Sequence, residues 1–184
     1  MKRRDAVKQV AILVGGVLSV PAVAGILQGC EAETGPDWIP EFFSVEQGDL
    51  VAEIAERIIP ATDTPGAKDA LVHRLIDKLL KVHFSPTEQE DFLTGLESLN
   101  QAGEKPFLSL SKEEQTSVLI AAEQTARKQQ NVSPKPFILL MKELTLLGYF
   151  TSEVGASQTL EYLHIPGNFE GCVPMKEGQK AWAV

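Results

Sequence analysis

Three short segments carry the pattern that most restricts the fold of this chain: a serine followed three residues later by Glu or Gln. In this capping box the serine hydroxyl accepts a hydrogen bond from an early backbone N–H of a helix, and the Glu or Gln side chain accepts one from the serine N–H. Apolar residues at helical spacing follow each box. We therefore predict helices near residues 44–59, 86–100 and 111–129. The boxes pair Ser44 with Gln47, Ser85 with Glu88, and Ser111 with Glu114.

Two further segments have helical apolar spacing without a capping box. Residues 69–83 are amphipathic, and Ser133 with Pro134 opens a helix that ends at Gly148, where glycine allows a left-handed stop. No segment alternates over strand length, so no sheet is expected. We predict an all-α fold, an irregular bundle of about five main helices with a loop-rich C-terminal tail. The inward residues expected in these two helices are Leu71, Leu75, Ile76, Leu79 and Leu80, and Phe137, Leu140, Met141, Leu144 and Leu147.

The first thirty residues have the layout of an export signal. A basic start precedes residues 10–27, which carry no charge. That run is short for a membrane-spanning helix, which needs roughly 17 to 25 residues, and it contains glycines and a proline. We predict an export signal over 1–29, a tether over 30–43 and one helical domain over 44–184. An uncleaved anchor helix is the alternative, and both place the domain outside the cytoplasm, in the periplasm or envelope.

Two patterns within this signal resemble known processing motifs. Arg3 and Arg4 resemble a twin-arginine signal, the route of proteins that cross the membrane already folded. The sequence Leu-Gln-Gly-Cys at residues 27–30 resembles the lipobox of bacterial lipoproteins, in which the cysteine is acylated. Cys30 is therefore the expected lipidation site, and the chain is expected to be membrane-anchored.

Charge and cysteine usage restrict the partners. The net charge of -8 at pH 7 repels the phosphates of nucleic acids, so we expect no nucleic-acid partner. The chain has two cysteines, and acylation of Cys30 would leave Cys172 as a lone thiol. In an oxidising compartment such a thiol is either buried or bonded to another chain, and both interpretations stay open.

The chain lacks the motifs that carry chemistry. Its three histidines do not have the spacing of three or four residues that helical metal sites use. It has no GxSxG nucleophile elbow and no GxGxxG joining a strand to a helix. Acidic pairs such as Asp63 with Asp69 are better explained as turn and surface residues. We predict no catalytic, cofactor-binding or metal-binding residue in this chain.

Three segments together resemble the gluconate 2-dehydrogenase subunit 3 family. Residues 56–67 read Glu-Arg-Ile-Ile-Pro-Ala-Thr-Asp-Thr-Pro-Gly-Ala and look like the hallmark segment of that family. Residues 144–155 and 166–174 resemble its C-terminal part. The resemblance implies a small subunit that accompanies a large FAD-containing subunit of the glucose-methanol-choline oxidoreductase type, often with a cytochrome c as electron acceptor. In such complexes the large subunit oxidises a sugar, sugar acid or glycoside, and the small subunit carries the export signal and supports folding of its partner.

On this interpretation two segments are candidates for the partner interface, the loop at 59–67 and residues 148–155, with Tyr149 and Phe150 as possible anchors. They are equally explained as internal core and turn residues, and the tail from residue 149 onward wraps either its own domain or a partner. The full set of expected interface residues is Pro60, Asp63, Pro65, Gly66, Tyr149, Phe150, Thr151, Ser152, Glu153 and Cys172.

Two other functions compete with the accessory subunit. One is a stand-alone envelope lipoprotein that acts as a scaffold and has no oxidoreductase partner. The other is a hydrolase whose catalytic residues are dispersed along the chain, which would predict activity in the purified chain alone.

Overall fold

The computed structural model describes residues 38–128, 134–165, 167–168, 171–175 and 177–183. The chain divides into two units, Met1–Ile39 and Pro40–Val184, and the description below concerns the second. Arg3, Arg4 and Cys30 lie outside the described residues, so export and lipidation stay predictions.

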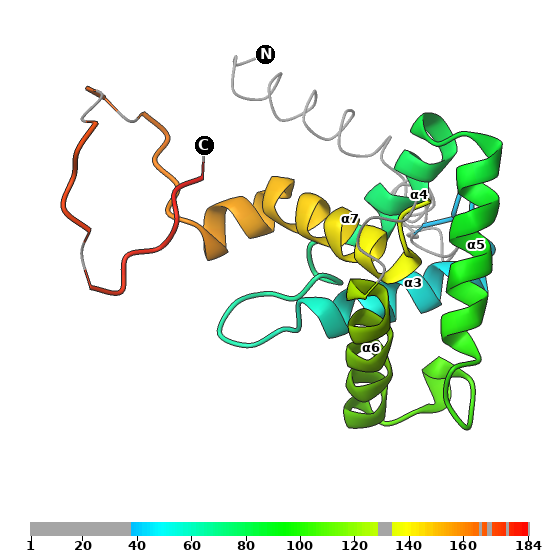
Figure 1. Cartoon of the computed structure of the whole chain (residues 1–184). Coiled ribbons are helices and arrows are strands. Elements are labelled where there is room, and N and C mark those ends of the chain that lie inside the picture. The colour runs from blue at the N-terminus through cyan, green and yellow to red at the C-terminus, as the bar shows by residue number, and fades with distance from the viewer. Residues whose placement is uncertain (1–37, 129–133, 166, 169–170, 176, 184) are drawn as a thin grey trace, which may run out of the picture. The chain divides into compact units, whose positions relative to one another are not determined.

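The described residues form five α-helices, and the all-α prediction is confirmed (Figure 1). A short 3-10 helix, η1 (Phe107–Ser109), precedes α6, and a π-helical turn, η2 (Gly155–Thr159), follows α7. Within the described ranges there is no strand, only an isolated β-bridge between Glu161 and Trp182. The α-helices are α3 (Val45–Ile58), α4 (Val72–His83), α5 (Pro86–Asn100), α6 (Lys112–Arg127) and α7 (Phe137–Thr151).

All three capping boxes form, which explains why three helices begin where the sequence predicts. At the start of α3, the Gln47 N–H donates to Ser44 Oγ at 3.2 Å and the Ser44 N–H donates to Gln47 Oε1 at 3.0 Å. The boxes at Ser85 and Ser111 have the same two reciprocal bonds. Each box satisfies backbone N–H groups that would otherwise have no partner within the helix.

Helix α7 is the centre of the bundle, because it packs against α3, α4, α5 and α6. Gly148 makes one of these contacts possible. A Cβ atom at Gly148 would lie 3.0 Å from Val72 Cγ1 and 3.3 Å from Leu75 Cδ2, so the missing side chain lets α7 approach α4 closely. The prediction that Gly148 ends this helix is therefore wrong. The helix continues to Thr151, and the glycine serves packing within it.

The starts of α4 and α7 also differ from the prediction. Helix α4 begins at Val72 rather than residue 69, because Leu71 adopts a left-handed conformation with φ of 53°. That conformation turns the Leu71 side chain outward, so it is exposed rather than inward-facing. Helix α7 begins at Phe137 behind Pro136, not at Pro134, and Leu147 is exposed rather than inward-facing.

A buried carboxylate holds the start of the domain. Asp77 on α4 is 1% exposed and accepts three backbone hydrogen bonds, from Glu41 at 2.7 Å, Phe42 at 3.0 Å and Phe43 at 2.9 Å. Phe43 lies in the core against Phe92. Residues 41–43, which we assigned to the tether, are thus held on the helical bundle itself.

Several titratable side chains of the helical bundle have shifted pKa values. Hydrogen bonds from the box serines lower the pKa of Glu88 and of Glu114. A hydrogen bond from Lys142 at 2.7 Å, assisted by an arginine on α6, lowers the pKa of Glu123. Burial is the main cause that lowers the pKa of His73. All four groups therefore favour the protonation state that is found at neutral pH.

We expect thermal stability to fall as the pH drops from about 7 to about 4. Because the pKa of His73 is lowered from 6.5, the unfolded chain binds this proton first, and stability declines from that pH down to the folded pKa. The carboxylates act in the same direction. Their contribution is complete above the unfolded pKa of 4.5 and is lost as the pH falls through their lower folded values. Circular dichroism melting curves test this, and the early part of the decline should disappear in His73→Gln. A melting temperature that stays constant or rises on acidification would contradict the expectation.

Candidate partner-binding site

The loop after α3 is held from inside by one carboxylate. Glu56 is buried on α3, and its Oε1 accepts the Ala61 N–H at 3.0 Å while its Oε2 accepts the Lys68 N–H at 2.9 Å. The two bonds join the beginning of the loop to its end. Because an ionised acceptor makes stronger hydrogen bonds than a neutral one, this pairing defines the path of the chain between them.

Gly66 allows the carboxylate to reach this position. A Cβ atom at Gly66 would overlap both oxygens of Glu56, so any other residue would displace the carboxylate or the loop. The Gly66 N–H donates to Asp69 Oδ2 at 3.0 Å, and the Thr62 N–H donates to the Thr64 carbonyl at 2.9 Å. The result is a tight loop whose tip is exposed at residues 61–63.

Tyr149 joins this loop to the end of α7. Its ring is 1% exposed, and its hydroxyl donates to the Pro65 carbonyl at 2.7 Å. The same hydroxyl lies 2.7 Å from Thr159 Oγ1 on η2. One side chain thereby connects the end of α7 to η2 and to a loop 84 residues earlier, and this loop lies beside the C-terminal end of α7 (Figure 1).

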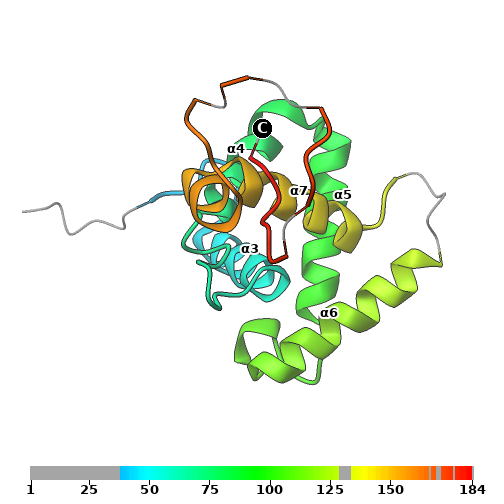
Figure 2. The same cartoon turned by 90° about the vertical axis from the view of Figure 1, so that its left-hand side faces the viewer.

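The turn that follows α7 depends on Ser152 and Gly155. Ser152 Oγ donates to the Tyr149 carbonyl at 2.7 Å and accepts the Gly155 N–H at 2.9 Å. A Cβ atom at Gly155 would collide with the Tyr149 carbonyl group, so this position excludes every larger residue. The turn directs the chain into η2 and then into the C-terminal tail (Figure 2).

These contacts divide the expected interface residues into two groups. Tyr149 and Gly66 are buried, and Pro65 and Ser152 are partly buried with contacts inside the fold. Of the two interpretations of Tyr149, possible anchor and internal residue, the structure supports the second, because its ring lies in the core and its hydroxyl bonds internally. The exposed members of the set are Pro60, Asp63, Phe150, Thr151, Glu153 and Cys172.

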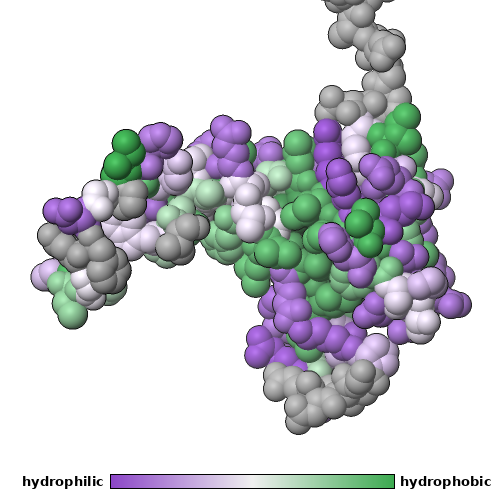
Figure 3. Space-filling model, turned by 90° about the horizontal axis from the view of Figure 1, so that it is seen from above, coloured by the Kyte–Doolittle hydropathy of each residue, from purple (hydrophilic) through white to green (hydrophobic). Residues whose placement is uncertain are grey.

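Phe150 belongs to an apolar patch that the sequence analysis missed. Its ring stacks edge-on against Tyr149 with the ring centroids 5.3 Å apart, and the side chain is 40% exposed. Leu146 and Leu147, one turn earlier on α7, are exposed as well. Seen from above, the middle of the molecule shows a gathering of hydrophobic residues (Figure 3). The signal in the sequence was that α7 is apolar on almost every side, which is more than one core-facing stripe requires.

Cys172 lies in the tail and is exposed as a free thiol. Burial, one of the two interpretations of this cysteine, is therefore wrong. Several described apolar residues of the tail are exposed as well. Tyr162, Leu163 and Ile165 are exposed, and so are Val173, Met175 and Trp182.

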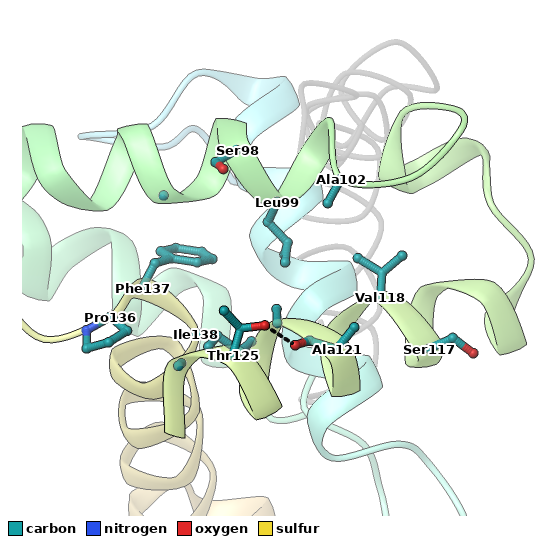
Figure 4. Close-up of a pocket in the computed structure, with 13 residues that line it drawn as sticks. Ser98, Leu99, Ala102, Ser117, Val118, Ala121, Thr125, Pro136, Phe137 and Ile138 are labelled. Carbon is teal, nitrogen blue, oxygen red and sulfur yellow. Dashed lines mark hydrogen bonds between the residues drawn. The ribbon is translucent and has the colours of Figure 1, made fainter. Parts of the chain in front are cut away.

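A groove of about 620 Å³ lies between α5, α6 and the start of α7 (Figure 4). Its walls consist of small and apolar residues such as Ala102, Val118 and Phe137, and no lining residue is titratable. The Thr125 hydroxyl at its edge donates to the Ala121 carbonyl at 3.0 Å. The groove therefore offers no acid, base or metal ligand to a substrate.

Across the described part of the chain, no group of three or more His, Cys, Asp or Glu side chains is placed to hold a metal ion. Likewise, none of the described helices combines the length and the apolar character needed to cross a bilayer. The two acidic residues near the loop tip are separated in role, because Asp69 accepts the Gly66 N–H while Asp63 is exposed.

At one end of the helical bundle, Glu56 and Tyr149 hold the loop at 59–67 from inside, and we call this part the braced end. Exposed apolar side chains accompany it, and the groove is lined by no titratable group. These are features of a binding module. Comparison with known proteins supplies the family. The sequence profile described as gluconate 2-dehydrogenase subunit 3 matches residues 45–167, and the chain belongs to this family, whose name denotes one subunit of a dehydrogenase complex. The match spans all five described α-helices and ends before Cys172. No curated protein and no solved structure matches the chain.

Proposed function

We propose that this chain is the non-catalytic small subunit of an exported, FAD-dependent dehydrogenase complex of the glucose-methanol-choline type. The partner holds the FAD and oxidises a sugar, polyol or glycoside, and a cytochrome c accepts the electrons. The observation that carries the proposal is the braced end of the molecule. There Glu56 and Gly66 of the hallmark-like segment, together with Tyr149, hold the loop from inside. Asp63 of this loop and Phe150 of α7 are exposed.

The chemistry of this end favours binding over catalysis. Glu56 and Tyr149 use their polar atoms on backbone and hydroxyl groups inside the fold. A general acid or base must instead reach a substrate. What remains accessible is a loop tip with small polar residues and a patch of apolar ones, which suits recognition of a protein surface.

Binding alone can account for the supporting role. A subunit that binds only the folded form of its partner stabilises that form by mass action, by about 2.7 kcal/mol when its free concentration is 100 times the dissociation constant. The twin-arginine-like Arg3 and Arg4 suit the same role, because this route carries folded proteins and would export the FAD-loaded partner together with this chain. Acylation of Cys30 would then hold the complex at the membrane.

The proposal is tested by recovering the tagged mature chain from the envelope fraction of its own cells and recording an absorbance spectrum of the eluate. We expect a larger protein to co-purify at a fixed ratio and to show flavin absorbance. A colourless single chain would contradict the complex and favour the stand-alone scaffold lipoprotein. Activity of the single chain on ester or glycoside substrates would favour the hydrolase.

A non-reducing gel of the same eluate determines the state of Cys172. A band at the combined mass of two chains that disappears in Cys172→Ser would place this cysteine at the interface. Recovery of the partner without that band would leave Cys172 as an exposed thiol, as it is in the isolated chain.

A further inference from the structure

We infer that the described residues of the C-terminal segment 161–182, here called the docking loop, insert their apolar side chains into a surface of the flavin-containing partner. This inference rests on the proposed function and names the part of the chain that supplies most of the affinity. It concerns a segment that the family match covers only as far as residue 167.

The docking loop is closed at its base. The Glu161 N–H donates to the Ala181 carbonyl at 2.7 Å, and the Ala183 N–H donates to the Glu161 carbonyl at 2.9 Å. Lys180 Nζ adds a third bond, to the Gln158 carbonyl at 2.7 Å. The chain that leaves η2 therefore lies beside the chain at Trp182 (Figure 1).

The side chains that this loop displays are large and apolar. Met175 is 89% exposed and Ile165 is 76% exposed, and neither contributes to the core. Several large apolar side chains exposed within one short segment are a feature of surfaces that bind another protein. The other exposed apolar residues of the loop are Tyr162, Leu163, Val173 and Trp182.

The loop is connected to the braced end of the molecule. Thr159, two residues before the base of the loop, contacts the hydroxyl of Tyr149, which also bonds to Pro65. The docking loop is thereby continuous with the surface proposed above to bind the partner. Closure of the loop before binding reduces the conformational entropy lost on association, which is how preorganised elements increase affinity.

A protein partner fits this loop better than a lipid surface. Segments that lie on membranes are rich in Lys and Arg, whereas residues 161–182 contain three Glu and two Lys, and Lys180 is engaged at the base of the loop. The whole chain is acidic, with a net charge of -8, and is repelled by anionic lipid. The surface that fits is therefore an apolar hollow on a protein, with a neutral or basic rim.

The test uses the full tagged chain, recovered from its own cells as the double variant Ile165→Ser with Met175→Ser. Because residues that insert into a partner surface dominate binding, we expect the flavin absorbance recovered per mole of tagged chain to fall about tenfold or more. The matched control is Val82→Ser on α4, whose side chain is 61% exposed and lies outside the loop. The control should recover the wild-type amount of flavin protein. Melting temperatures of all three purified chains should agree, because the altered side chains are exposed.

The outcomes separate this inference from the proposed function. If the wild-type chain recovers no flavin protein, the proposed function fails and the inference fails with it. If wild type and double variant recover equal amounts, the inference alone is overturned. Sedimentation with vesicles of phosphatidylethanolamine and phosphatidylglycerol supplies the third outcome. Vesicle binding by wild type that is lost in the double variant, with partner recovery unchanged, would assign the loop to lipid and overturn the inference.

Discussion

Replacing Tyr149 with Ala is expected to lower the free energy of unfolding by about 4 kcal/mol. The ring fills a fully buried position at the end of α7, and its loss leaves a cavity that the helix cannot close. The hydroxyl is also lost, together with its bonds to Pro65 and Thr159. The loop after α3 and the turn η2 would then lose the side chain that joins them.

Urea unfolding followed by circular dichroism measures this loss, and Tyr149→Phe is the matched control. Phe keeps the ring and removes only the hydroxyl, so we expect a smaller loss of about 1–2 kcal/mol. Equal losses in the two variants would show that the ring contributes nothing. No loss in Tyr149→Phe would show that the two hydroxyl contacts do not brace the loop.

Replacing Asp77 with Ala is expected to lower the free energy of unfolding by about 3 kcal/mol. Three backbone N–H groups at residues 41–43 lose their acceptor, and that of Phe43 is buried. Hydrogen bonds to a charged group contribute more than neutral ones, and a buried donor left without a partner costs its full desolvation. Phe43 would also lose its position against Phe92 in the core.

Asp69→Ala is the control for Asp77→Ala, because the Asp69 side chain is exposed and accepts a single backbone N–H, from Gly66. We expect its effect to stay within about 1 kcal/mol. Thermal melts of both variants beside wild type measure the difference. Similar melting temperatures for the two variants would contradict the role of Asp77 as the anchor of the domain's first residues.

Local signals in the sequence predicted much of this fold, while helix ends decided by packing were predicted wrongly. A capping box is satisfied by atoms within four residues, so the starts at Ser44, Ser85 and Ser111 follow from sequence alone. Gly148 was interpreted as a stop because glycine favours left-handed turns, but in the fold it lies where α7 meets α4. Such a contact depends on a segment about 75 residues away and leaves no local mark.

The same limit applies to the candidate site. The sequence analysis placed the loop at 59–67 and residues 148–155 in one interface, and the structure brings them together through the Tyr149 hydroxyl and Pro65. It did not distinguish buried Tyr149 from exposed Phe150, because adjacent residues in a helix differ by about 100° in direction and α7 is apolar on nearly every side. Only the packing of neighbouring helices determines which direction is covered.

By itself the sequence determined the all-α class, the positions of three helix starts, the absence of familiar catalytic motifs and the likeness to a subunit family. These depend on short-range hydrogen bonds, periodicity and residue identity. The tertiary structure decided that Glu56 and Tyr149 brace a loop, that Asp77 holds residues 41–43, and that Ile165 and Met175 of the docking loop stay exposed. Each of these depends on contacts between residues far apart in sequence, or on the lack of them, and such contacts exist only once the helices have packed.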